Sequence, residues 1–171
     1  MSGSSLYLKR YSGFQLPVYS LILFIAVFLA FPGHASANDD VDELLAHATA
    51  PDGVVFEIVE SDESALEYLL PRVRDAITRI RKMYPDTDFA VVSHGREEFA
   101  LQTRYQTEQP EIHNAVLSLV ADDVPVHVCE THAGWYGVSA EDFPDYVDVA
   151  PTGPGQIRLY LELGYHLIVI E

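Results

Sequence analysis

Residues 124–129 read VPVHVC, an apolar and β-branched run that ends in the only cysteine of the 171-residue chain. A run of this composition, bounded by polar residues, is typical of a buried β-strand. Four more segments share this character and predict further strands: 54–59 (VVFEIV), 89–93 (FAVVS), 146–149 (YVDV) and 165–170 (YHLIVI). The chain therefore predicts a sheet of about five strands.

A long helix is expected between the first two strands. Apolar residues recur at helical spacing over residues 66–80, and Ser64 with Glu67 forms a capping-box pattern in front of them. Pro71 interrupts the pattern, which leaves two alternatives. Either a short turn precedes a helix that begins near Leu70, or one helix is kinked there.

Two further helices are predicted later in the chain. Pro110 begins the first, whose apolar face is formed by Ile112, Ala115, Val116, Leu119 and Val120. The second covers residues 155–163, with Ile157, Tyr160 and Leu161 facing inward, and Gly164 suits the left-handed cap that ends it.

The segments outside these elements are less regular. Residues 95–106 have no clear period and predict a longer loop, whereas Ser139 and Asp142 are spaced as a second capping box. Residues 38–50 are acidic and weakly patterned, so we expect a flexible arm or a short helix there.

Alternating strands and helices, with nearly continuous apolar strands, indicate a mostly parallel sheet covered by helices on both faces. The expected fold is an α/β, three-layer α/β/α sandwich. Ligands of such sheets bind beyond the carboxyl ends of the strands. The positions to inspect are therefore 60–62, 93–95, 129–132 and 150–153.

Residues 1–37 have the organisation of a cleavable secretory signal. Lys9 and Arg10 precede eleven apolar residues, 21–31 (LILFIAVFLAF), and the small residues Ala35 and Ala37 mark a cleavage site. The run is shorter than the roughly 20 apolar residues that a membrane-spanning helix needs. We therefore expect a periplasmic protein, although an uncleaved N-terminal anchor is the alternative. The predicted organisation is a signal over 1–37, an N-terminal arm over 38–53 and one α/β domain over 54–171.

Cleavage after Ala37 leaves 134 residues, which suffices for one hydrophobic core. The remaining chain has 8 basic residues against 26 acidic ones, a formal charge of −18. Such a charge argues against nucleic acid and, once the signal is removed, against anionic membranes as partners. A single cysteine cannot form an internal disulfide, so the core must supply the stability.

Cys129 and His94 are the candidate catalytic residues, because each follows a predicted strand. A thiol at such a strand end can be stabilised as a thiolate by nearby backbone N–H groups. It can equally be a small buried hydrophobic residue, and the carboxylate of Glu130 beside it favours that alternative. His94 could act as a base toward the thiol or simply anchor its loop by hydrogen bonds.

His127, Cys129 and His132 form an H-x-C-x-x-H set, which makes them weak candidates for copper or zinc ligands. The set lacks a fourth ligand nearby, so we expect no tightly bound metal. The chain has no phosphate-binding loop, HExxH or GxSxG motif, and no cofactor is expected.

The order of these features resembles that of the DsrE/DsrF-like family. The resemblance covers residues 54–170 and lies in the strand ending at His94-Gly95, the strand VPVHVC ending at Cys129, the Gly137-Val138 turn and the closing segment GQIRLYLELGYHLIVI. Its most specific element is the strand-terminal cysteine followed about eight residues later by Gly-Val. Members of that family are small α/β proteins, often trimers or hexamers, that carry sulfur as a cysteine persulfide. The resemblance implies that Cys129 bears the sulfur, with His94 as a neighbouring loop residue.

The leading functional hypothesis is a sulfur carrier, or sulfurtransferase-like protein, that holds sulfane sulfur on Cys129 without a cofactor. Its partners would be sulfur donor and acceptor proteins or small thiols, and the resemblance implies a homo-oligomer. The alternative is a non-catalytic binding or assembly module with the same fold. Handling of copper or zinc is the weakest of the three hypotheses. We expect the exposure of Cys129 to separate the first two.

Overall fold

The computed structural model describes residues 37–171. The predicted secretory signal lies outside the described residues except for Ala37, its last position, which begins the first helix. Among residues 37–171, no helix is both long and apolar enough to cross a membrane.

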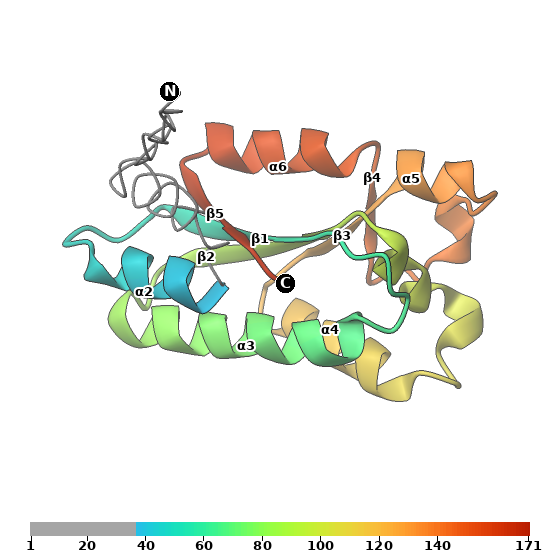
Figure 1. Cartoon of the computed structure of the whole chain (residues 1–171), viewed down its shortest axis with the longest axis horizontal. Coiled ribbons are helices and arrows are strands. Elements are labelled where there is room, and N and C mark those ends of the chain that lie inside the picture. The colour runs from blue at the N-terminus through green and yellow to red at the C-terminus, as the bar shows by residue number, and fades with distance from the viewer. Residues whose placement is uncertain (1–36) are drawn as a thin grey trace, which may run out of the picture. The chain divides into compact units, whose positions relative to one another are not determined.

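The described chain folds as alternating helices and strands (Figure 1). In chain order these are α2 (Ala37–Ala46), β1 (Gly53–Ile58), α3 (Leu66–Met83), β2 (Asp88–Ser93), the 3-10 helices η1 (Arg96–Leu101) and η2 (Thr103–Tyr105), α4 (Pro110–Ala121), β3 (Val126–Cys129), α5 (Glu130–Trp135), the 3-10 helix η3 (Ala140–Asp142), β4 (Asp148–Ala150), α6 (Gly153–Glu162) and β5 (Tyr165–Val169).

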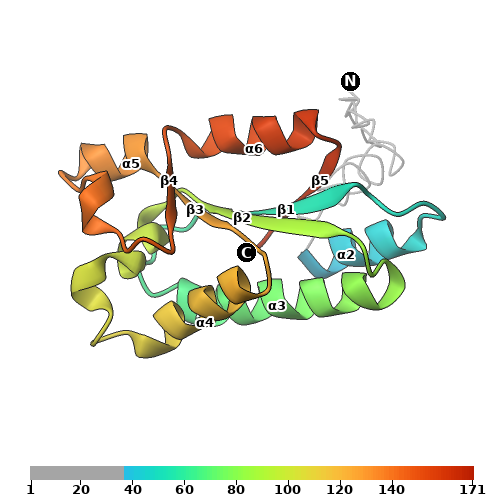
Figure 2. The same ribbon diagram turned by 180° about the vertical axis from the view of Figure 1, so that it is seen from behind.

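The five strands form one sheet in the order β4-β3-β2-β1-β5, and every neighbouring pair is parallel. Helix α6 covers one face, and α2, α3 and α4 lie on the other (Figures 1 and 2). The expected three-layer α/β/α architecture is confirmed, with a sheet that is parallel throughout rather than mostly parallel. The connections all require crossovers, which is why strands and helices alternate along the chain.

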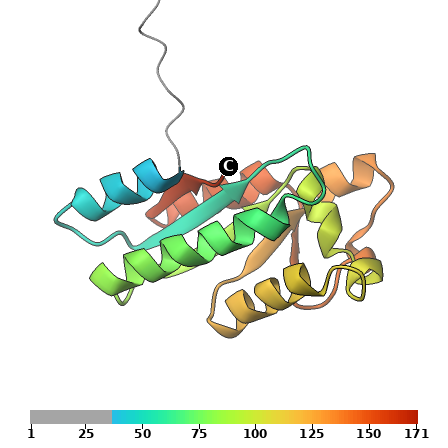
Figure 3. The same ribbon diagram turned by 60° about the horizontal axis from the view of Figure 1, so that its bottom comes forward.

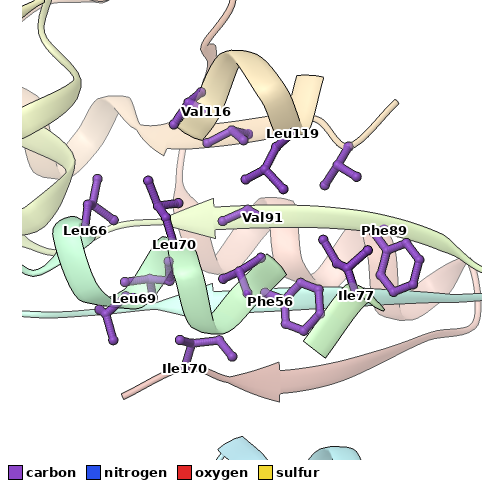
Figure 4. Packing of buried hydrophobic residues seen from close by; sticks show 14 of the residues in the cluster. Phe56, Leu66, Leu69, Leu70, Ile77, Phe89, Val91, Val116, Leu119 and Ile170 are labelled. Carbon is purple, nitrogen blue, oxygen red and sulfur yellow. The ribbon is translucent and has the colours of Figure 1, made fainter. Parts of the chain in front are cut away.

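The larger hydrophobic core lies between the sheet and the α2, α3 and α4 layer. Alternate residues of β1, Phe56 among them, point into it and meet the apolar stripe of α3, including Leu66 and Leu69 (Figure 4). Helices α3 and α4 lie beside each other beneath the sheet (Figure 3). Each fully buried large apolar side chain contributes roughly 1.5–3 kcal/mol. This layer therefore supplies most of the hydrophobic stabilisation.

The core on the α6 face is much smaller. It consists of Val55, Ala90, Val92 and Ile157, with Tyr160 packed against it. Ile157 faces inward as predicted, but Leu161 is 44% exposed, so its predicted inward position is wrong. The core on this face depends on α6, and only one stripe of a single helix can reach the sheet.

Helix α3 begins at Leu66 and runs as one element through Pro71. The first of the two sequence alternatives, a short turn before a helix that begins near Leu70, is therefore wrong. The capping box predicted for Ser64 is wrong, because the N-cap is Ala65 and has no side-chain cap. The Ser64 hydroxyl and N–H both donate to Asp62 Oδ1 instead, at 2.9 Å each. Ser64 therefore takes part in a local turn in front of the helix and does not occupy the N-cap position.

The segment predicted as a loop, residues 95–106, contains η1 and η2 instead. Five of the six residues of η1 are buried, including Glu97 and Glu98. Hydrophobic periodicity does not reveal buried carboxylates, because charged residues are ordinarily exposed. Glu97 and Glu98 of η1 contact the residues at the carboxyl ends of the strands, as described below.

The remaining predictions differ only at element boundaries. The capping box at Ser139 and Asp142 is present, and Gly164 has the expected left-handed backbone, with φ of 88°. The acidic N-terminal segment is the short helix α2 over its first part, and Val41 and Leu44 anchor it in the larger core.

Candidate functional site at the carboxyl edge of the sheet

A pocket of about 320 Å³ lies where β2, β3 and β4 end. Its lining comes from the residues that follow these strands: His94, Cys129, Thr131, His132, Trp135, Thr152 and Pro154. Ser93 pairs with Val128 in the sheet, so the next residues, His94 and Cys129, emerge side by side. The two predicted catalytic residues therefore line one pocket, in the place that parallel sheets use for ligands.

A second pocket, of about 370 Å³, lies between α3 and α4. It is lined by Glu67, Glu108 and Glu111 together with apolar residues, and it holds neither the cysteine nor a histidine. The smaller pocket has the only thiol of the chain and is the better candidate for chemistry.

The Cys129 thiol is free, and the residue lines the smaller pocket with only 4% of its surface exposed. Cys129 is also the N-cap of α5, and its Sγ accepts a hydrogen bond from the backbone N–H of His132 at 3.3 Å. An N–H donor at this position stabilises negative charge that develops on the sulfur. The low exposure means that a reagent reaches the sulfur only through the pocket.

Glu98 lies behind the cysteine and is fully buried. Its Oε2 accepts a hydrogen bond from the backbone N–H of Cys129 at 2.8 Å, and its Oε1 lies 2.8 Å from His132 Nδ1. Burial raises the pKa of Glu98 to about 7, with a smaller contribution from Glu97, against the opposing effect of those two hydrogen bonds. Glu98 thus changes its charge close to neutral pH.

The ring of His132 is fixed by aromatic neighbours. It stacks on Phe99 at a centroid distance of 5.4 Å and an interplanar angle of 10°, and Tyr136 and Trp135 pack against it at 5.2 and 5.7 Å. Its side chain is 14% exposed. Trp135 is 75% exposed and forms the outer wall of the pocket.

His94, which also lines the pocket, pairs with a second carboxylate. Its Nε2 lies 2.8 Å from Glu57 Oε1, and the two side chains are 14% and 22% exposed. The ring also lies against the α-carbon of Gly153, where a Cβ would come within 2.6 Å of His94 Cγ. His94 is therefore held between β1 and the start of α6.

Glu97 organises the backbone behind this edge. Its Oε1 accepts hydrogen bonds from Ser93 Oγ at 2.7 Å and from the Gly95 N–H at 3.0 Å. Its Oε2 accepts one from the Glu60 N–H at 2.6 Å. The carboxylate thereby joins the residues that follow β1 to those that follow β2.

The structure separates the weak metal candidates. His127 Nε2 lies 2.8 Å from the Tyr160 hydroxyl, and His127 does not line the pocket that holds Cys129 and His132. Burial lowers the pKa of His127, partly opposed by the charge of Asp148. Within residues 37–171, no group of three or more His, Cys, Asp or Glu side chains is arranged to hold a metal ion.

Three residues of this edge were not predicted: Glu57, Glu97 and Glu98. Glu57 lies inside a strand and points to the α6 face between residues of the larger core. Glu97 and Glu98 lie three and four positions after His94, just beyond the segment 93–95 that the strand-end argument selects. The carboxylate of Glu130, which in the sequence favoured an unreactive cysteine, belongs to an exposed residue.

Comparisons with known proteins support the α/β fold and identify no family or function. No protein-family model matches the chain, and no curated protein matches it. Among solved structures, the chain is similar to MTH1491 of Methanobacterium thermoautotrophicum, a protein of unknown function, with a TM-score of 0.54 and 24% identity. The match covers 68% of this chain and 96% of that one. The α/β fold is therefore shared with a solved structure.

Proposed function

We propose that this protein is a sulfur carrier, or sulfurtransferase-like protein, that holds sulfane sulfur as a persulfide on Cys129. The observation that carries the proposal is the contact between the free Cys129 thiol and the His132 N–H, 3.3 Å apart, in the lining of a pocket. A thiolate so placed can attack a sulfane sulfur and later release it to an acceptor thiol. The resemblance to DsrE/DsrF-like proteins also implies that Cys129 is the residue that bears the sulfur.

The proposed setting is the periplasm, reached through the secretory signal predicted over residues 1–37. The proposed partners are small thiols or donor and acceptor proteins, and a trimer or hexamer is the proposed assembly. With Cys129 only 4% exposed, the donor must place its sulfur inside a pocket of about 320 Å³. That volume suits a small persulfide or the tip of an inserted side chain.

A binding or assembly module is the second candidate, and one observation favours it. Trp135 and Tyr136 are 75% and 53% exposed next to an almost fully buried cysteine. Exposed aromatic side chains of this size are common at protein interfaces. In this alternative the thiol is inert and the aromatic residues contact a partner.

Mass spectrometry distinguishes the two candidates. Reduced protein is mixed with 2-hydroxyethyl persulfide, and the peptide that contains Cys129 is examined for one added sulfur, with Cys129→Ser as the control. We expect one sulfur on the folded wild-type protein and none on the variant. Uptake by the unfolded chain but not by the folded protein would replace the carrier proposal with the binding module.

A further inference from the structure

Two histidines line the pocket beside Cys129, and each is hydrogen-bonded to a carboxylate, but the two pairs differ in burial and in their contact with the cysteine. Glu57 of the His94 pair is 22% exposed and has no hydrogen bond to the cysteine. Glu98 of the other pair is fully buried, and it binds both the His132 ring and the backbone N–H of Cys129. The Glu98 carboxylate thus connects the sulfur-bearing residue to one particular imidazole.

The connection determines which ring nitrogen of His132 carries a proton. An ionised carboxylate can only accept hydrogen bonds, so Nδ1 of His132 must be the donor to Glu98 Oε1. The other nitrogen, Nε2, is then unprotonated and able to act as a base. Phe99, Tyr136 and Trp135 hold the ring in one orientation.

We propose that His132 is the acid–base residue of the sulfur-transfer site and that Glu98 is the residue that positions it. The inference rests on the proposed function, because it assigns the proton transfer that the function requires. His132 contacts the reacting sulfur through its own backbone N–H, and its ring lines the same pocket. The catalytic assignment thereby moves from His94, which the sequence favoured, to His132.

The reaction balances without an oxidant or a cofactor. His132 Nε2 takes the proton of the Cys129 thiol, and the thiolate attacks the outer sulfur of a persulfide R–S–SH. The S–S bond of the donor breaks, and its electron pair stays on the R–S sulfur as a new S–S bond forms on Cys129. The imidazolium returns its proton to R–S⁻, which leaves as R–SH. The products are Cys129–S–SH and a thiol.

The electrostatic surroundings favour an imidazolium during this step. Glu98 faces His132 from η1, Glu97 lies next to Glu98 in the chain, and His94, which is hydrogen-bonded to Glu57, also lines the pocket. When Glu98 is ionised, its charge stabilises the protonated ring. Because the pKa of Glu98 is about 7, the transfer rate should increase with pH through neutrality.

The test measures the rate of sulfur loading on Cys129 against pH, with 2-hydroxyethyl persulfide as the donor. His132→Gln should lower the rate at pH 7 by about 10²-fold while the final amount of bound sulfur stays the same. His132→Ala should recover part of the rate when free imidazole is added, which a purely structural role would not allow. His166→Gln, which changes an exposed histidine on β5, is the matched control and should load at the wild-type rate.

Glu98→Gln tests the positioning role with a side chain of the same size. The glutamine amide donates to Nδ1, which moves the ring proton to Nε2 and removes the base. We expect a rate that is about 10-fold to 100-fold slower and that lacks the wild-type increase near pH 7. Glu162→Gln, at the exposed end of α6, is its control.

The outcomes separate the two proposals. If the wild-type protein takes up no sulfur, the proposed function itself fails. If the wild type loads but both His132→Gln and Glu98→Gln load at its rate and with its pH profile, the sulfur carrier stands and the acid–base assignment is overturned. If His132→Gln does not fold, the Glu98→Gln profile decides.

Discussion

Glu97 and Glu98 are neighbours in the chain, yet their carboxylates bind different parts of the sheet edge. Glu97 holds the residues after β1 and β2, whereas Glu98 holds Cys129 at the end of β3 and the helix that follows it. Consecutive side chains of a 3-10 helix point in different directions, which allows one short segment to bind three strand ends. The two residues should therefore affect stability and reactivity differently.

Glu97→Ala should destabilise the fold. The substitution leaves the N–H groups of Glu60 and Gly95 and the hydroxyl of Ser93 without their acceptor, which should cost about 3–5 kcal/mol of unfolding free energy. Urea unfolding measures the loss, and Glu108→Ala, an exposed position, is the control. A loss of less than about 1 kcal/mol would contradict the bracing role of Glu97.

Glu98→Gln should change how stability depends on pH. Folding raises the pKa of Glu98 from 4.5 to about 7, so the folded state holds a proton that the unfolded state releases between these pH values. In the wild type, the contribution of Glu98 to the free energy of unfolding is therefore largest below pH 4.5. It decreases as the pH rises toward 7, by up to about 3 kcal/mol. Glutamine does not titrate and removes this decrease.

The measurement is the free energy of unfolding of Glu98→Gln minus that of the wild type at several pH values. The difference should become more positive from pH 4.5 to about 7 and level off above it. Subtracting the wild type cancels the other carboxyl groups of this acidic chain. A difference that does not vary with pH would show that Glu98 ionises normally in the folded protein.

Gly153→Ala should disturb the His94 wall of the pocket. A methyl group at residue 153 would lie 2.5 Å from His94 Cβ, so the ring or the start of α6 must shift. The expected cost is about 1–3 kcal/mol in urea unfolding. Gly134→Ala is the matched control, because no atom lies within 4 Å of the new methyl group, and it should be neutral or slightly stabilising. Equal effects of the two substitutions would contradict the close packing of His94.

The doubly charged donor thiosulfate should load Cys129 slowly at low salt. The chain has a formal net charge of −16, and Glu57 and Glu98 lie beside the pocket, so thiosulfate should be repelled more strongly than 2-hydroxyethyl persulfide, which carries at most one negative charge. Salt screens such repulsion, since the Debye length falls from about 10 Å at 0.1 M to about 3 Å at 1 M. The rate ratio between the two donors should therefore narrow as salt is added. If the ratio of the two loading rates does not change with salt, the charge of the protein does not determine which donor reacts faster.

Export should produce a mature protein that begins at Asn38. Ala35 and Ala37 are the small residues that a signal peptidase recognises. Intact mass spectrometry of protein recovered from the periplasm measures the cleavage position. A full-length protein in the membrane fraction would contradict the export proposal.

The convergence of His94 and Cys129 could be predicted from the sequence, because both follow apolar strands and parallel strands end at one edge. Glu97 and Glu98 could not be predicted in the same way. Their burial depends on hydrogen bonds from backbone N–H groups and from a histidine, which belong to distant segments. The local sequence around Glu97 and Glu98 does not indicate these partners. The one available signal is position: both follow closely after a strand end.

The Ser64 capping box failed for a comparable reason on a smaller scale. The sequence spacing of Ser64 and Glu67 fits a cap, but Asp62 lies close enough to take the same hydroxyl. Helix α3 begins one residue later than the spacing implies, so Ala65 and not Ser64 occupies the N-cap position. At Ser139 the hydroxyl and the N–H both donate to Asp142, and the box forms.

The position of β1 between β2 and β5 has a consequence for how the chain reaches its folded state. Gly53 pairs with Tyr165, more than a hundred residues away, and the Ile170 N–H donates to the Glu57 carbonyl at 2.9 Å. The first strand to be synthesised therefore waits for residues 165–170 before its second neighbour exists. Pairings this distant make folding slow. For a chain that must cross a membrane unfolded, as the export proposal requires, that delay keeps it competent for translocation until residues 165–170 have been synthesised.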